Sequence, residues 1–83
     1  MTFRIIAERE KTTDVVRVYG RLVGKVALEE FLHACQPAEA ALVIDLTDLR
    51  LADEEALSAL RSLRQKGVRL RGVSPYISLL LGS

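Results

Sequence analysis

Hydrophobic and polar residues alternate near the start of the chain in the manner of two β-strands. Short runs rich in β-branched residues, Phe3–Glu8 and Asp14–Tyr19, are separated by a polar stretch over residues 9–13 that can turn the chain. The pattern predicts a β-hairpin whose second strand is broken at Gly20. The segment Arg21–Val23 is then expected to pass over the sheet edge toward a helix.

Two later segments have the period of amphipathic helices. The first runs from about Lys25 to Gln36 and is ended by Pro37. The second, Asp53–Lys66, opens with acids, closes with cations and is followed by Gly67, where a left-handed cap is favoured. Both apolar faces are expected to pack on a sheet. These faces comprise Ala27, Leu28, Phe31, Leu32, Ala34 and Cys35 in the first helix and Ala56, Leu57, Ala59, Leu60 and Leu63 in the second.

The remaining segments complete an α/β pattern. Ala41–Leu46 is almost continuously apolar, as in a central strand covered on both faces, and Val68–Arg71 alternates as a half-exposed strand. Ser74 is expected to cap a short helix over Tyr76–Leu81, with a proline at its first position. The predicted order is β-β-α-β-α-β-α. Right-handed crossovers then predict a mixed sheet of four to five strands in which the first strand runs antiparallel.

Composition narrows the range of functions. The chain has 83 residues, 49% hydrophobic and 28% charged, and is expected to form one domain over residues 1–83. A net charge of +1 disfavours nucleic acid and anionic membrane partners, and no apolar stretch approaches the ~18 residues that span a bilayer. A single cysteine excludes an internal disulfide and suits the cytoplasm. We expect a cytoplasmic protein without membrane insertion.

No residue pattern indicates catalysis or a cofactor. His33 and Cys35 are the sole histidine and cysteine, and on a helix they point about 200° apart, so they cannot share a metal ion. Cys35 lies on the apolar face, which favours an inert core thiol over a reactive one, and His33 is expected in solvent. The motifs of nucleophilic serine hydrolases and of phosphate-binding glycine loops are absent from the sequence.

Charge is unevenly distributed in the second half of the chain, so the molecule is expected to be polarised. The basic stretch could contact phosphate or an acidic partner, but the favoured interpretation is a helix end that complements the macrodipole followed by a solvated strand face. The acids are Asp45, Asp48, Asp53, Glu54 and Glu55, and the cations are Arg61, Arg64, Lys66, Arg69 and Arg71.

Three segments resemble the STAS domain family, named for sulphate transporters and anti-sigma-factor antagonists. Val16–Leu22 is similar to the family's strand ending in Gly-x-Leu, and Leu42–Thr47 to its central strand ending in Asp-Leu-Ser/Thr. Gly72–Tyr76 is similar to its last strand-to-helix corner. The order and spacing of these segments carry the resemblance, which covers nearly the whole chain. It implies a non-catalytic, STAS-like interaction module.

The segment Ala52–Leu57 falls where the family carries Asp-Ser-Ser-Gly-Leu. Asp53 matches the aspartate, whereas Glu54 and Glu55 replace the serines. In the antagonists the first serine is phosphorylated by the partner kinase, so the resemblance implies that Glu54 holds this position without a hydroxyl to modify. The acids can simply stabilise the helix. Alternatively, Glu54 imitates the phosphorylated state with about half the charge of a phosphate. Ser58, one turn later, is a weaker candidate phosphosite.

The outward face at the start of this helix is the candidate partner-binding site. Its residues are Asp53, Glu54, Glu55, Ser58 and Arg61. The resemblance implies a protein partner, either an anti-sigma factor or switch-kinase-like protein or a transporter-associated protein. The alternatives are a STAS domain that senses a small ligand or nucleotide, and an accessory subunit of a transporter.

The run Leu79–Leu81 bears on assembly. Three consecutive leucines cannot all face inward on one helix, and the chain is rich in hydrophobic residues for its size. We therefore expect an apolar patch that another chain covers, in a homodimer or a stable complex. The alternative is that these leucines fold back across the open end of the sheet.

Overall fold

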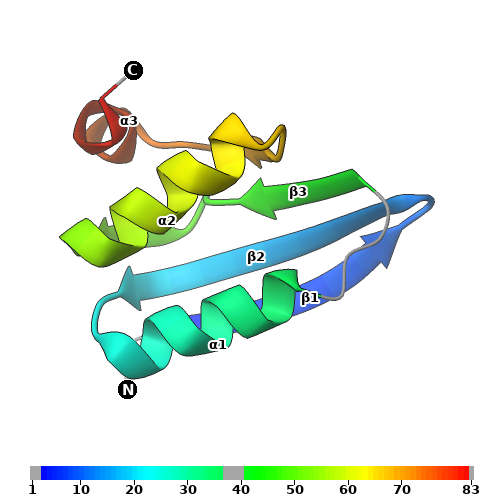
Figure 1. Cartoon of the computed structure of the whole chain (residues 1–83), viewed down its shortest axis with the longest axis horizontal. Helices are drawn as coiled ribbons and strands as arrows, with labels where there is room; N and C mark the ends of the chain where they lie inside the picture. The colour runs from blue at the N-terminus through cyan, green and yellow to red at the C-terminus, as the bar shows by residue number, and fades with distance from the viewer. Residues whose placement is uncertain (1–2, 37–40, 83) are drawn as a thin grey trace.

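In the part of the chain that the computed structural model describes, three helices pack against one face and one end of a five-stranded mixed sheet (Figure 1). The structure describes residues 3–36 and 41–82. The elements are β1 (Phe3–Glu10), β2 (Thr13–Leu22), α1 (Lys25–Cys35), β3 (Ala41–Asp45), β4 (Leu49–Ala52), α2 (Glu54–Gln65), β5 (Arg69–Arg71) and α3 (Pro75–Leu81). The predicted α/β class and mixed sheet are confirmed.

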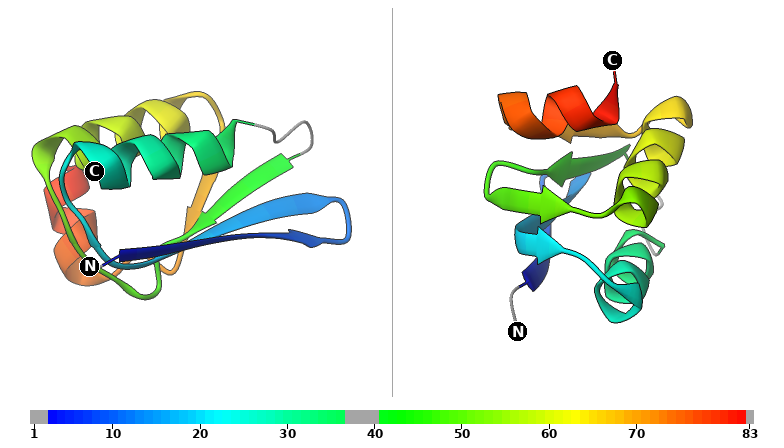
Figure 2. Two further views of the ribbon diagram at one scale, coloured as in Figure 1. Left: turned by 90° about the horizontal axis from the view of Figure 1, so that it is seen from below. Right: turned by 90° about the vertical axis from the view of Figure 1, so that its left-hand side faces the viewer.

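The strands follow the order β1-β2-β3-β5, and β4 pairs with β2. β1 runs antiparallel to β2, whereas the other described strands pair in parallel, as predicted. α1 and α2 lie side by side on one face of the sheet, and α3 lies at its end near α2 and β4 (Figure 2). No described helix covers the opposite side, which we call the open face.

A strand that the sequence analysis missed lies between β3 and α2. β4 pairs in parallel with β2, so that Leu49 lies opposite Gly20 and Ala52 opposite Leu22. The predicted element order is therefore wrong here, and the observed order is β-β-α-β-β-α-β-α. β4 has four residues and no β-branched side chain, so its composition does not distinguish it from a loop.

Gly20 does not end β2, contrary to the prediction. The strand continues to Leu22, and its pairing with β4 shifts between Gly20 and Arg21. Gly20 has a φ of 82°, a conformation that glycine adopts at little cost and that is found in β-bulges. The irregularity lets one long strand pair first with β3 and then with β4.

Each long helix buries the face that the sequence predicts. The buried side chains are Ala27, Phe31 and Cys35 in α1 and Ala56, Leu57 and Leu60 in α2. They share one core with Val16, Val18 and Ile44 of the sheet. Leu32 is an exception, because it stands at the margin of the α1 face and is 39% exposed. Pro37, the predicted end of α1, lies outside the described residues.

The start of α3 is also as predicted. Ser74 Oγ accepts a hydrogen bond from the amide of Ile77 at 3.2 Å, and a proline follows the cap. Within the leucine run, Leu81 is buried and Leu80 partly buried, but Leu79 is 78% exposed. The three leucines therefore do not all face inward. That a second chain covers the exposed one stays a prediction.

The loop after β3 meets the corner before α3 at Gly72. A Cβ added to Gly72 would overlap Thr47 Oγ1 and lie 3.1 Å from Thr47 Cα. Thr47 cannot easily withdraw, because its hydroxyl donates a hydrogen bond of 2.6 Å to Asp45 and its amide donates another of 3.0 Å. Gly72 also has a φ of 69°, which L-residues rarely adopt.

We predict that Gly72→Ala lowers the free energy of unfolding by about 2 kcal/mol or more, since backbone strain and overpacking add. Gly67→Ala is the matched control: Gly67 also has a positive φ, but a Cβ there meets open space. It should cost only about 1 kcal/mol. Urea denaturation measures both, and equal losses would show that the Thr47 contact is unimportant.

Candidate functional site

Asp53 joins the starts of the two long helices. It caps α2, where its Oδ1 accepts a hydrogen bond from the amide of Ala56 at 2.9 Å. Its Oδ2 accepts another from the amide of Gly24, the N-cap of α1, at 2.8 Å. Amides at helix N-termini lack acceptors within the helix, so a single carboxylate here serves donors from two helix starts.

The backbone reinforces this link, because the amide of Asp53 donates to the carbonyl of Leu22 at 3.2 Å. The hydrogen bonds from Gly24 and then from Ala56 lower the pKa of Asp53 and outweigh the effect of burial. Asp53 is therefore ionised at neutral pH, and its negative charge stands where the α2 dipole is positive.

Beyond Asp53, the first turn of α2 presents carboxylates to solvent. Glu54, Glu55 and Ser58 are exposed, and the Glu54 side chain retains 81% of its accessible surface. Val23 is 45% exposed. Its neighbour Gly24 is hydrogen-bonded to Asp53, so Val23 lies close to the start of α2. We call Val23, Glu54, Glu55 and Ser58 the acidic surface.

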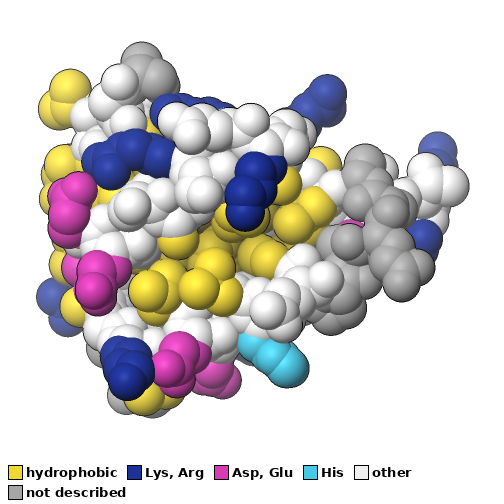
Figure 3. Space-filling view, viewed as in Figure 1, with side chains coloured by type: hydrophobic (Ala, Val, Ile, Leu, Met, Phe, Trp, Pro, Cys, Tyr) yellow, Lys and Arg dark blue, Asp and Glu magenta, His cyan; other side chains and the backbone are white. Residues whose placement is uncertain are grey.

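An apolar band lies between α1 and α2, and acidic side chains stand at the end of it where both helices begin (Figure 3). On these helices Leu28 and Leu63 are partly buried against the core, and Leu32 is 39% exposed. Apolar contacts flanked by charges are typical of protein interfaces. This arrangement fits a protein segment that carries both apolar and cationic side chains.

Arg61 belongs to α2 but reaches to α3. Its Nε donates to the carbonyl of Leu81 at 3.1 Å, and its Nη2 donates to that of Leu80 at 3.0 Å. Its Nη1 lies 3.4 Å from Oε2 of Glu54. Carbonyls in the last turn of a helix lack donors within the helix and attract a cation, so Arg61 caps α3.

The structure thus divides the predicted partner-binding residues into two groups. Glu54, Glu55 and Ser58 are exposed and can contact another molecule. The polar groups of Asp53 and Arg61 are instead occupied by the backbone of the helices that they connect. That the exposed group binds a partner stays a prediction.

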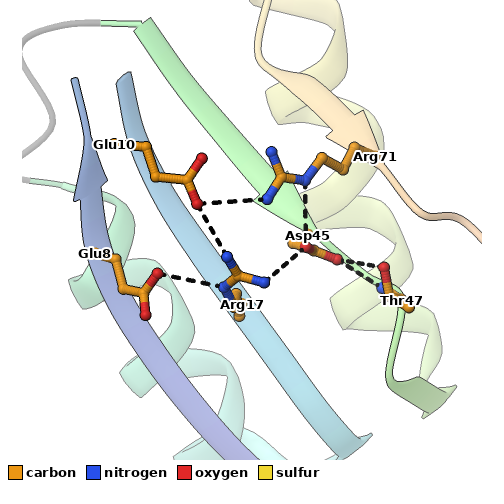
Figure 4. Close-up of polar contacts among 6 residues, drawn as sticks. All are labelled: Glu8, Glu10, Arg17, Asp45, Thr47 and Arg71. Atoms are coloured by element: carbon orange, nitrogen blue, oxygen red, sulfur yellow. Dashed lines mark hydrogen bonds and ion pairs between the residues drawn. The ribbon is translucent and has the colours of Figure 1, made fainter. Parts of the chain in front are cut away.

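A second polar group, which no sequence motif indicates, lies on the open face of the sheet. Asp45 Oδ2 accepts hydrogen bonds from Arg17 at 3.3 Å and from Arg71 at 3.2 Å (Figure 4). Arg17 also pairs with Glu10 at 3.0 Å and with Glu8 at 3.5 Å. We call Glu8, Glu10, Arg17, Asp45, Thr47 and Arg71 the open-face cluster; it links β1, β2, β3 and β5.

Asp45 is 8% exposed, and both of its oxygens are occupied. Burial opposes its ionisation, but the hydrogen bonds from Thr47 and the charged Arg71 outweigh burial, and the pKa of Asp45 is lowered. A carboxylate with every acceptor position engaged has no free lone pair for substrate or for proton transfer. The acceptor positions of Asp45 are therefore used to connect β2, β5 and the loop after β3.

These ion pairs also reduce the predicted charge polarity. Two acids of the acidic stretch pair with two cations of the basic stretch: Asp45 with Arg71 at 3.2 Å, and Glu54 with Arg61 at 3.4 Å. The two stretches partly neutralise one another, so a separate basic face is not the dominant feature of the molecule.

Cys35 and His33 lie as the sequence predicts. Cys35 is buried, and burial raises its pKa to about 11, so the thiol is protonated at neutral pH. His33 is exposed on the same helix. Within residues 3–36 and 41–82, no three histidine, cysteine or acidic side chains gather in a way that could hold a metal ion.

No helix in the described part of the chain is both long and apolar enough to cross a membrane. No protein-family model matches the chain, and no curated protein is significantly similar to it. Its structure, however, is similar to the crystal structure of an antisigma-factor antagonist, a STAS domain from Rhodobacter sphaeroides. The TM-score is 0.65 at 25% sequence identity, over 99% of this chain and 92% of that one.

The fold is that of a STAS domain. The resemblance inferred from the sequence motifs is thus confirmed at the level of three-dimensional structure. In this STAS fold the acidic surface lies at the start of α2, where Glu54 and Glu55 follow the capping Asp53. The correspondence of Glu54 to a phosphorylated serine stays an expectation from the motif alone.

We predict that Asp53→Asn lowers the free energy of unfolding at neutral pH by about 1 kcal/mol, because the amide can cap α2 but cannot also accept from Gly24 with a charged oxygen. The folded-state pKa of Asp53 is depressed, so its charge stabilises the fold above about pH 4 and ceases to do so as the pH falls further. The difference between wild type and variant should shrink below about pH 4 in denaturation series. A difference independent of pH would show that the charge contributes nothing.

Proposed function

We propose that this chain is a non-catalytic STAS-type module that binds a regulatory protein in the cytoplasm through the acidic surface. The observation that carries the proposal is the difference between polar side chains bound to the backbone and polar side chains exposed to solvent at the start of α2. Asp53 accepts hydrogen bonds from backbone amides of both helix starts, whereas Glu54, Glu55 and Ser58 are exposed to solvent. Exposed carboxylates on a rigid framework steer and orient a cationic partner without performing chemistry.

The fold neighbour suggests the class of partner. The similar structure is an antisigma-factor antagonist, and we infer that this chain engages an anti-sigma factor or a switch-kinase-like protein, with a transporter-associated protein as the other candidate. The two glutamates offer no hydroxyl to a kinase. Partner affinity at this position would then be set by permanent charges, and its regulation would come from partner abundance or from another site.

A nucleotide-sensing role is less well supported. A helix N-terminus can bind phosphate through free amides, but here the amides of Gly24 and Ala56 already donate to Asp53. Glu54 and Glu55 would also repel a polyphosphate. These contacts favour protein binding over nucleotide binding at the start of α2.

The central test reverses one charge on the acidic surface. Glu54→Arg should reduce the affinity for the captured partner about tenfold or more, since like charges then face one another across the interface. The partner is first identified by affinity capture from the source cell with the wild-type chain. Binding of the purified partner is then measured by calorimetry with wild type and variant.

Asp48→Arg is the control for this experiment. Asp48 is also an exposed acid, but it lies between β3 and β4 and belongs neither to the acidic surface nor to the hollow beside β1. It undergoes the same change of charge without touching the acidic surface. If both variants bind like wild type, or lose affinity equally, the start of α2 is not the docking site.

We also predict that ATP and GTP produce no binding heat when titrated into the wild-type chain, because Glu54 and Glu55 repel a polyphosphate and Asp53 already accepts from the amides of Gly24 and Ala56. Asp53→Ala is the informative comparison, as it frees those amides while Glu54 and Glu55 remain. Saturable nucleotide binding by the wild type that Glu54→Arg strengthens would favour the sensing role instead.

A further inference from the structure

The outer edge of β1 is an unused pairing surface. β1 has eight residues and, among the described strands, pairs with β2 alone. An edge strand of this length presents a row of backbone donors and acceptors that can bind another strand. Proteins commonly protect such an edge with charges, so the positions of the charges on β1 decide what it can accept.

The hairpin geometry shows which backbone groups point outward. Glu10 pairs with Thr13 across a two-residue loop that contains Lys11, whose φ is 56°. Residues that flank such a loop form a hydrogen-bonded pair, and these pairs alternate along an antiparallel ladder. The even-numbered residues of β1 therefore bond to β2, whereas Phe3, Ile5, Ala7 and Arg9 direct their amides and carbonyls away from the sheet.

A second copy of the same strand matches this edge in one register. If two β1 strands run antiparallel about a two-fold axis at Ile6, Ile5 lies opposite Ala7 of the other copy, and both present outward backbone groups. In the same register Arg4 lies opposite Glu8 of the other copy, and Ile6 opposite itself. Two pairs of opposite charge then flank an apolar centre, which is the favourable arrangement for cross-strand neighbours.

Neighbouring registers lack this match. A shift of one residue places outward backbone groups against inward ones. Centring the axis on Ala7 places Glu8 opposite Ile6 and Arg9 opposite Ile5, while centring it on Ile5 places Arg4 opposite Ile6. Each of these sets a charge against an apolar side chain next to the axis, whereas the register about Ile6 does so only at its ends, where Phe3 lies opposite Arg9.

The side chains involved are available for such contacts. Arg4 is exposed and, among the described residues, has no ion-pair or hydrogen-bond partner. Glu8 holds one ion pair, from its Oε1 to Arg17 at 3.5 Å, and is 47% exposed. A shallow hollow lined by Ile5 and Val26 gives access to the strand from the side of α1. Glu29 and Glu30 line the same hollow, and their repulsion between copies opposes pairing, so the contact is expected to be reversible.

We propose that this chain forms a homodimer in which β1 pairs antiparallel with β1 of a second copy about Ile6. One sheet then continues across both copies, and each copy keeps its own acidic surface. This contact is separate from the docking site proposed above. A dimer would present two docking sites and could increase the apparent affinity for a multivalent partner.

Complementary charge reversals test the pairing. Arg4→Glu and Glu8→Arg each place like charges opposite one another in a homodimer, and each should weaken self-association about tenfold or more. An equimolar mixture of the two variants restores both opposite-charge pairs, so a heterodimer should form. Sedimentation equilibrium measures these species against the 9.2 kDa monomer, and Arg50→Glu, an exposed site on β4, is the control that should dimerise like wild type.

Amide hydrogen exchange of the wild-type chain provides a second measurement that requires no variant. Protection of the Ile5 and Ala7 amides should rise with protein concentration, whereas the Ile6 and Glu8 amides are protected by β2 at every concentration. A monomer at millimolar concentration overturns the proposal. So does a dimer that both charge variants leave unchanged, or a mixture that fails to associate. Loss of partner binding by Glu54→Arg tests the docking site independently of all these outcomes.

Discussion

The carboxylate of Asp53 is the contact on which the arrangement of the molecule depends most. It accepts a hydrogen bond from the amide of Gly24 at the start of α1, 29 residues earlier in the chain, and another from the amide of Ala56 in the first turn of α2. The orientation of α2 relative to α1 is thereby fixed at the end where both helices leave the sheet. The same contact occupies two of the amides that could otherwise attract an anion, and the adjacent glutamates face outward. The Asp53 contacts thus both fix the two helices and position the exposed glutamates.

The open-face cluster covers part of the sheet face that no described helix covers. Helices cover one face only, yet Val15 and Val43 on β2 and β3 are buried in addition to the helix-side core. Paired charged side chains on the open face take the place of a second helical layer around Asp45. Because two arginines pair with three carboxylates, most of the charge in this layer is compensated, and the layer shields the strands without creating a strong field.

The helices and the sheet class were predictable because amphipathic period, caps and strand composition are local signals. β4 was not predictable, since Leu49–Ala52 carries no β-branched residue and acquires its structure from pairing with β2. For the candidate site, the helical period placed Glu54 and Ser58 outward correctly. It also placed Arg61 outward, but a long guanidinium side chain can reach around the helix to carbonyls of α3. Contacts between distant segments, such as Asp53 with Gly24 or Asp45 with Arg17, leave no pattern in a single sequence.

The reactivity of the buried Cys35 in α1 can report how often this helix detaches from the sheet. A thiol with a pKa of about 11 is almost wholly unreactive at neutral pH while α1 stays on the sheet. Alkylating reagents would therefore label Cys35 chiefly in molecules whose first helix has detached, and the labelling rate would follow the population of such open forms. Ligands that tighten the helix layer would slow this reaction, even when they bind far from the sulfur.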